Sequence, residues 1–131
     1  MQAVCRLESK FFDSKFDVAK FYGEKMADKE TNAVLTQFNK QIRMRLGNNL
    51  KALILFGSKA RGDDEPDSDY DCLAVVDEVT HDIKNHIDEL AGELLFEHSA
   101  VFSIFPISEK AYQQRPFDPF LNNIRREGVV L

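Results

Sequence analysis

Apolar side chains recur at spacings of three and four residues between Thr31 and Gly47. The repeating positions are Leu35, Phe38, Ile42 and Leu46. This spacing places them on one face of an amphipathic helix. Thr31 is available to cap the start of the helix, and Gly47 is suited to end it. We therefore predict a helix between these two residues that buries one face.

Three short apolar segments predict strands. Residues 51–56 become wholly apolar after Lys51 and are followed by Gly57, which is typical of a strand buried on both faces. Residues 70–76 follow a polar loop and predict the second strand. Residues 99–107 are rich in Val, Phe and Ile and predict the third.

Two further helices complete the pattern. One begins near Thr80 and carries an apolar face formed by Ile83, Ile87, Leu90, Ala91, Leu94 and Leu95. The other is short, with Asp118 as its cap, Pro119 in its first turn and Gly128 just past its end. The order helix, strand, strand, helix, strand, helix predicts an α+β fold, in which helices cover a small mixed β-sheet.

The length of 131 residues and a hydrophobic content of 44% favour one domain. We assign residues 30–131 to this domain. Residues 1–29 form an N-terminal extension, which we expect to be irregular or helical. Its phenylalanines, Phe11, Phe12, Phe16 and Phe21, indicate that it packs against another surface. No repeat and no linker rich in Pro, Gly or Ser divides the chain.

Charge and hydropathy exclude several classes of protein. The chain has 17 Lys+Arg and 22 Asp+Glu, and its net charge of −5 argues against general nucleic-acid binding. The longest apolar run, 52–56, is far below the roughly 20 residues that span a membrane. The N-terminus lacks the apolar stretch of a secretion signal, so we expect a cytoplasmic protein. Cys5 and Cys72 have no Cys/His cluster beside them, which argues against zinc.

Gly57-Ser58 is the first of two motifs that indicate chemistry. A buried strand that ends in Gly-Ser and runs into a short helix presents free backbone N–H groups and a hydroxyl to an anion. Lys59 or Arg61 can neutralise the charge of a bound phosphate. A Gly-Ser pair taken alone is usually just a turn.

Asp69 and Asp71 form the second motif. They stand two apart on a predicted strand, so both side chains point to one face, with Cα atoms roughly 6.5 to 7 Å apart. Two such carboxylates can hold a hard cation such as Mg²⁺. A solvated strand entrance is the alternative, although the apolar run after Asp71 favours a sheet edge that faces a pocket. The acidic spacing also fits part of an EF-hand loop, but the required glycine position holds Cys72.

Together the two motifs resemble a known family. Gly57-Ser58, ten intervening residues, and Asp69-Tyr70-Asp71 followed by an apolar strand resemble the signature of the polymerase-beta-type nucleotidyltransferase superfamily. The flanking Leu-Phe-Gly-Ser-x-Ala-Arg-Gly and Ser-Asp-x-Asp are similar to its minimal bacterial and archaeal members, over roughly residues 31–131. The resemblance implies a polymerase-beta-like fold, catalytic Asp69 and Asp71 that hold one or two Mg²⁺ ions, and a nucleoside triphosphate held by Gly57 and Ser58.

The implied reaction transfers a nucleoside monophosphate, AMP from ATP, to an acceptor hydroxyl. About 100 residues leave little chain for an acceptor-binding domain, so we expect a partner protein to present the acceptor. Minimal members are commonly encoded beside a small helical toxin and act as antitoxins by attaching AMP to it. Two alternatives remain open: an inactive module that neutralises or regulates a partner, and an enzyme for a small acceptor such as an aminoglycoside. Self-association is also left open.

The sequence departs from the family on the third predicted strand. Active members usually carry a third carboxylate there, whereas residues 99–107 contain no Asp or Glu. Alternation places Ser103 on one face together with Phe105. Glu97 lies just before the strand, but we expect it at the exposed end of the preceding helix. The departure puts efficient two-metal catalysis in doubt, and leaves the fold and triphosphate binding untouched.

Overall fold

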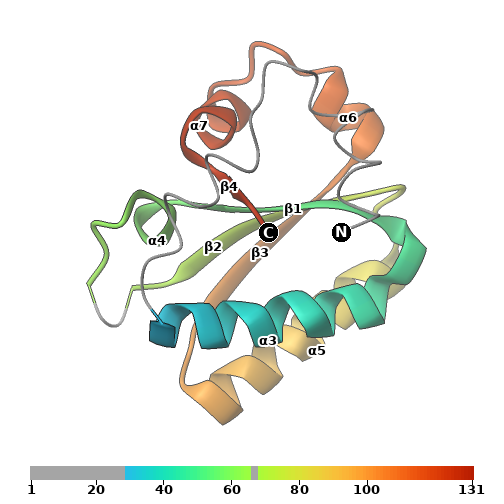
Figure 1. The fold of residues 1–131 in the computed structure, drawn as a ribbon. Coiled ribbons are helices and arrows are strands. Elements are labelled where there is room, and N and C mark those ends of the chain that lie inside the picture. The colour runs from blue at the N-terminus through green and yellow to red at the C-terminus, as the bar shows by residue number, and fades with distance from the viewer. Residues whose placement is uncertain (1–28, 66–67) are drawn as a thin grey trace.

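The computed structural model describes residues 29–65 and 68–131. Its elements are α3 (Lys29–Leu46), η1 (Gly47–Asn49), β1 (Leu50–Phe56), α4 (Ser58–Arg61), β2 (Tyr70–Val76), α5 (His81–His98), β3 (Phe102–Ser108), α6 (Glu109–Gln113), α7 (Pro119–Glu127) and β4 (Val129–Val130). Figure 1 shows helices on both sides of one sheet. This arrangement confirms the predicted α+β class.

The four strands of the described residues form one mixed sheet in the order β3-β2-β1-β4. β1 pairs antiparallel with β2 and with β4, and β2 pairs parallel with β3. A parallel pair needs a crossover connection, which α5 supplies. Phe56 lies opposite Asp71 on β2, and Asp71 in turn lies opposite Ser103 on β3. Three strands therefore meet at one level near the end of β1.

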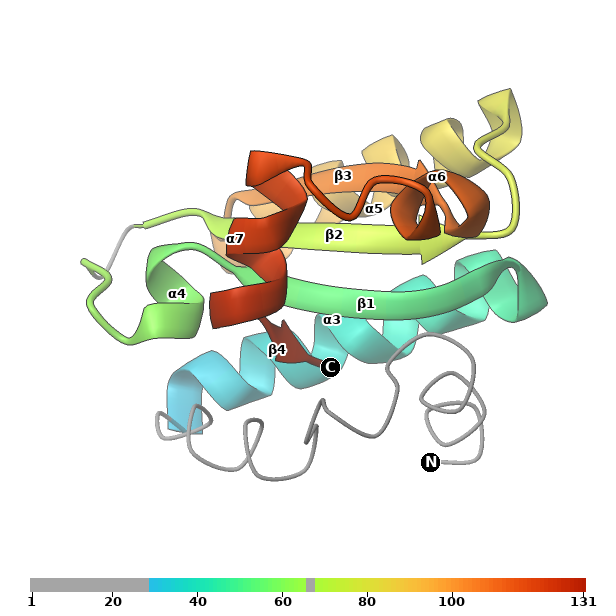
Figure 2. The ribbon, with the colours of Figure 1, turned by 90° about the horizontal axis from the view of Figure 1, so that it is seen from above.

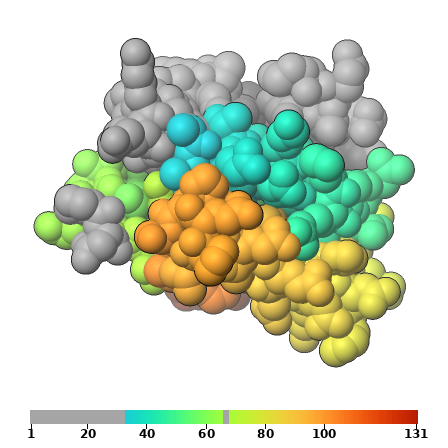
Figure 3. Space-filling view, turned by 90° about the horizontal axis from the view of Figure 1, so that it is seen from below, coloured from blue at the N-terminus to red at the C-terminus, as the bar shows by residue number. Residues whose placement is uncertain are grey.

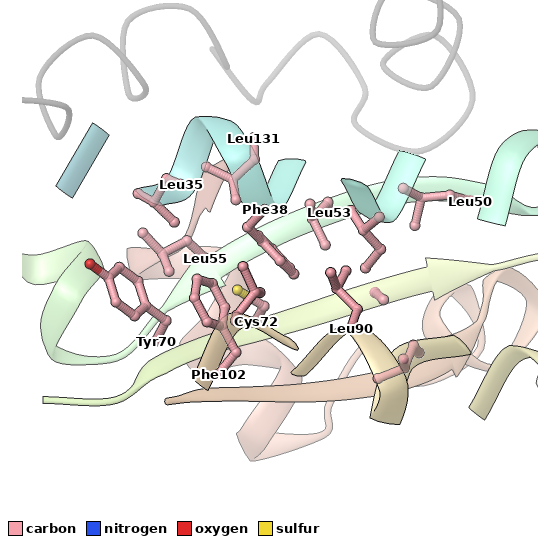
Figure 4. Close-up of a cluster of buried hydrophobic side chains, with 14 of the residues drawn as sticks. Leu35, Phe38, Leu50, Leu53, Leu55, Tyr70, Cys72, Leu90, Phe102 and Leu131 are labelled. Carbon is pink, nitrogen blue, oxygen red and sulfur yellow. The ribbon is translucent and has the colours of Figure 1, made fainter. Parts of the chain in front are cut away.

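Helices α3 and α5 cover one face of the sheet and enclose the larger core (Figure 4). Phe38 of α3 is fully buried, and its ring centroid lies 4.5 Å from that of Phe102 on β3. Burial of such a side chain contributes about 2 to 3 kcal/mol. Arg45 of α3 forms ion pairs with Glu89 and Glu93 of α5. The two helices meet in a continuous surface on this side (Figure 3).

Helices α6 and α7 lie on the opposite face, as Figure 2 shows from above. Leu121 and Ile124 of α7 pack with Leu73 and Val75 of β2 in a second buried cluster. This is the face toward which Asp71 points, because Asp71, Leu73 and Val75 alternate along one strand. The smaller helical layer therefore borders the candidate site.

Local signals predicted several boundaries well. β2 has the predicted bounds, α3 ends before Gly47, and Thr80 and Asp118 cap their helices through hydrogen bonds to backbone N–H groups. Thr31 is not a cap, because α3 already begins at Lys29.

The third strand begins later than predicted. It starts at Phe102 because Ser99, at φ 53°, is the left-handed C-cap of α5. The chain pattern did not predict α6 or β4. The predicted extension over 1–29 lies almost wholly outside the described residues. None of the described helices is long and apolar enough to cross a membrane.

Candidate active site

The backbone of Gly57 and the carboxylate of Asp71 lie in direct contact at the end of β1. Gly57 has φ 79° and ψ −160°, a conformation that is essentially restricted to glycine. A Cβ atom built on Gly57 would lie 2.5 Å from Oδ2 of Asp71. Only glycine therefore permits both the turn and this close approach.

Helix α4 begins directly after Gly57 and is open at its N-terminus. The N–H groups of Ala60 and Arg61 donate to the Gly57 carbonyl, and no side chain caps the helix within the described residues. In that part of the chain, the N–H groups of Ser58 and Lys59 have no backbone acceptor. These two N–H groups, together with the hydroxyl of the partly exposed Ser58, are able to donate hydrogen bonds to phosphate oxygens; phosphate binding here stays a prediction.

Asp69 and Asp71 lie close enough to repel each other. Partial burial raises the pKa of Asp71, and the negative charge of Asp69 raises it further. The positive charge of Arg61 opposes both effects. A divalent cation would remove this repulsion, so the carboxylate pair fits a hard metal ion such as Mg²⁺. Within residues 29–65 and 68–131 there is no cluster of three or more His, Cys, Asp or Glu suited to a metal.

The structure separates the roles of the two basic residues on α4. The Lys59 side chain is only 5% exposed, with its Nζ 3.0 Å from Oδ2 of Asp64 and 4.6 Å from the centre of the Tyr70 ring. The charge of Lys59 is thus already paired with Asp64, and of the two predicted alternatives Arg61 is the more accessible cation.

Arg61 remains accessible, at 44% exposure of its side chain. Its Nε lies 3.2 Å from Oδ2 of Asp63, and its Nη1 lies 2.9 Å from Oε1 of Glu127 at the end of α7. The guanidinium is thus held beside Asp71 by residues from two separate segments. The contribution of Glu127 was not predicted, because this residue lies 66 positions further along the chain.

Ser103 occupies the position on β3 that faces Asp71, in register and half-buried. This placement agrees with the predicted alternation. Glu97 is exposed in the last turn of α5, as expected. β3 therefore presents the Ser103 hydroxyl at the level of Asp71, on the strand where active family members usually carry the third carboxylate.

Three phenylalanine rings cluster on the face of the sheet toward which Asp71 points, and the sequence did not predict them as part of the site. Phe56 of β1, Phe105 of β3 and Phe120 of α7 have ring centroids 5.6 to 6.1 Å apart. Phe105 and Phe120 are 44% and 47% exposed, which is unusual for large apolar side chains. Strand alternation predicted the face of Phe105, but only the fold brings α7 against it.

The sequence is that of a nucleotidyltransferase. The family model of the nucleotidyltransferase domain matches residues 35–118, and the chain belongs to that family. The "Putative protein adenylyltransferase MJ0604" of Methanocaldococcus jannaschii is 31% identical over 97 residues, which are 74% of this chain and 93% of that protein. A second protein of that organism with the same description, MJ0141, is 32% identical over 73% of this chain and 93% of its own length.

Solved structures confirm the fold. A toxin-antitoxin crystal structure with AMP-PNP superposes with a TM-score of 0.54 at 19% identity, over 72% of this chain and 69% of that chain. A mutant of the toxin-antitoxin MntA-HpeT gives a TM-score of 0.55 at 17% identity, with the same coverage.

Proposed function

We propose that this nucleotidyltransferase transfers AMP from ATP to a hydroxyl group on a partner protein. The observation that supports the proposal is the contact between the Asp71 carboxylate and the Gly57 backbone, because Gly57 directly precedes the first N–H groups of α4 and the charge of Asp69 acts on Asp71. The N–H groups of α4 can then bind the triphosphate, while the carboxylates lie near its α-phosphate. Residues 30–131 are the proposed catalytic domain.

In this proposal Ser58 and the first N–H groups of α4 bind the β- and γ-phosphates, and Arg61 neutralises part of their charge. Asp69 and Asp71 hold Mg²⁺, which when bound offsets the negative charge that develops on the phosphate oxygens. The acceptor oxygen attacks the α-phosphorus and gives its proton to water, the bond from that phosphorus to the bridging oxygen breaks, and pyrophosphate leaves. Ser103 is a poor base at neutral pH, so with water as the proton acceptor we expect slow turnover.

A protein acceptor is supported by the names of the relatives. Two relatives are described as "Putative protein adenylyltransferase", and two of the solved neighbours are toxin-antitoxin structures. The described residues form one sheet with two helical layers and no separate acceptor-binding domain. We therefore propose a partner of the toxin class, bound together with ATP.

Incubation with labelled ATP, Mg²⁺ and the product of the neighbouring gene tests this function. Wild type should label the partner, whereas Asp69→Asn and Asp71→Asn should each abolish labelling. Asp77→Asn is the matched control, because Asp77 is an exposed aspartate at the other end of β2, paired with Lys51. Equal labelling by wild type and both site variants would refute the proposal.

The second candidate is a binding module with feeble or no catalysis, which Ser103 in place of a carboxylate favours. Such a module would neutralise its partner by occupying the partner's surface. The test uses cells whose growth is stopped by the toxin-class partner. If the Asp69→Asn, Asp71→Asn double variant restores growth to the wild-type level, the binding module is favoured over the enzyme.

A further inference from the structure

A hollow of about 370 Å³ opens between β3 and the α6–α7 connection, next to the candidate active site. Phe105 and Phe120 line it, with Leu73 and Ile107 at its base and Arg115 and Asp118 also in its wall. Its volume lies in the range of small-molecule sites, which are usually apolar with a few polar groups. Leu73, which pairs with Phe105 across the two strands, lines the hollow and lies two residues along β2 from Asp71, so the hollow and Asp71 lie on the same face of the sheet.

The rings of Phe105 and Phe120 form a corner. Their planes meet at 78° with centroids 6.0 Å apart, and Phe56 packs behind both. A flat aromatic group that lies on one ring would meet the other edge to face, and both arrangements are favourable for aromatic pairs. Nearly half of each side chain is exposed, so the corner has aromatic surface to offer.

The spacing of backbone positions along the sheet is comparable with the length of a nucleoside. Phe105 lies two residues along β3 from Ser103, which is level with Asp71, so about 6.5 to 7 Å separate the two positions. Six covalent bonds of about 1.5 Å join an α-phosphorus to the base nitrogen of a nucleotide, and their zigzag spans roughly 6 to 8 Å. Figure 2 shows α4 beyond the end of β1 and α7 crossing the strands further along. A triphosphate on α4 therefore leaves its nucleoside directed toward the corner.

Polar groups in the wall of the hollow can bind the edge of a base. Asp118 uses Oδ1 to accept hydrogen bonds from the Phe120 and Leu121 N–H groups, so its Oδ2 remains available. Among the described residues, the Arg115 side chain has no hydrogen-bond or ion-pair partner. The site thus offers one acceptor and one cationic donor beside two stacking surfaces.

We propose that the hollow binds the nucleobase of the donor nucleotide, stacked in the corner of Phe105 and Phe120. This inference rests on the proposed function, because it uses Asp69 and Asp71 to fix the position of the α-phosphate. It identifies the two rings as substrate-binding residues and assigns the hollow to the donor nucleotide rather than to the acceptor.

The test compares binding of ATP and of inorganic tripolyphosphate, each with Mg²⁺, by calorimetry on the full chain. Phe105→Leu and Phe120→Leu keep apolar volume but remove the stacking surface, and each should weaken ATP binding roughly tenfold without changing tripolyphosphate binding. Phe120→Tyr retains an aromatic ring and should therefore bind ATP with the wild-type affinity, unlike Phe120→Leu. Phe117→Leu is the control, because Phe117 is 89% exposed on the same connection and does not line the hollow.

Each remaining outcome overturns the inference. If the leucine variants lose affinity for ATP and for tripolyphosphate equally, the rings only support the phosphate site. Unchanged ATP binding with a raised KM for the protein acceptor would assign the hollow to the acceptor. Failure of the wild type to bind either ligand would refute the proposed function itself, and is thereby distinguishable from failure of the base site alone.

Discussion

Replacement of Gly57 by alanine tests whether the backbone of β1 and the carboxylate of Asp71 are fitted to each other. The conformation at Gly57 costs a residue with a side chain about 1 to 3 kcal/mol. The added Cβ would lie 2.5 Å from the Asp71 carboxylate, which must rotate away. An off-rotamer side chain adds about 0.5 to 1.5 kcal/mol. We expect Gly57→Ala to lower the free energy of unfolding by about 2 to 4 kcal/mol.

Gly62→Ala provides a matched control within the same segment. Gly62 also has a positive φ, 84°, but a Cβ there meets nothing within 4 Å. Its cost should be limited to the left-handed backbone, about 1 to 2 kcal/mol. Displacement of Asp71 by about 1 Å should also reduce labelling activity roughly 100-fold in Gly57→Ala, with little change in Gly62→Ala.

Denaturant unfolding and the ATP-labelling assay measure both effects. In an Asp71→Ala background the clash disappears, so the cost of Gly57→Ala in unfolding free energy should fall by about 1 kcal/mol, through loss of the rotamer contribution. If the two glycine variants lose the same stability and the same activity, the close contact between Gly57 and Asp71 does not shape the site.

Three further predictions concern charge and burial. Asp71→Asn should raise the free energy of unfolding at pH 7 without metal while it abolishes labelling, because a raised pKa means that the fold disfavours the ionised carboxylate; a loss of stability would contradict this. Asp64→Asn should cost about 1 kcal/mol at pH 7, since it leaves Lys59 buried without its partner. Because the Lys59 hydrogen bond lowers the pKa of Asp64, this difference from wild type should shrink as the pH falls below about 4, and a constant difference would refute the linkage. In a Cys5→Ser variant, Cys72 should react with iodoacetamide only after unfolding, because full burial raises the pKa of its thiol well above the usual range; rapid labelling of the native protein would show otherwise.

The predictable features of this chain are the local ones. Capping by Thr80 and Asp118 and the bounds of β2 depend on neighbouring residues, so the pattern of the sequence contains them. The site motif was found in the same way, because Gly57 and Asp71 lie close together in sequence.

Long-range contacts were not predictable from one sequence. The ion pair of Arg61 with Glu127 joins residues 66 positions apart, and the three-ring cluster takes one phenylalanine from each of three elements. β4 is only two residues long, so its pairing with β1 leaves almost no periodic signal. In each case the tertiary arrangement, rather than local propensity, decides the contact.

Pro106 affects how this molecule can associate with others. It lies in the middle of β3, which is an edge strand of the sheet formed by the described residues. Proline has no N–H to donate, and it is tolerated at an edge because that side of the strand faces away from its neighbour. An incoming strand would therefore find the hydrogen-bond ladder broken at its centre. The edge thus resists strand addition and aggregation, and a protein partner should bind through side chains rather than by extending the sheet along β3.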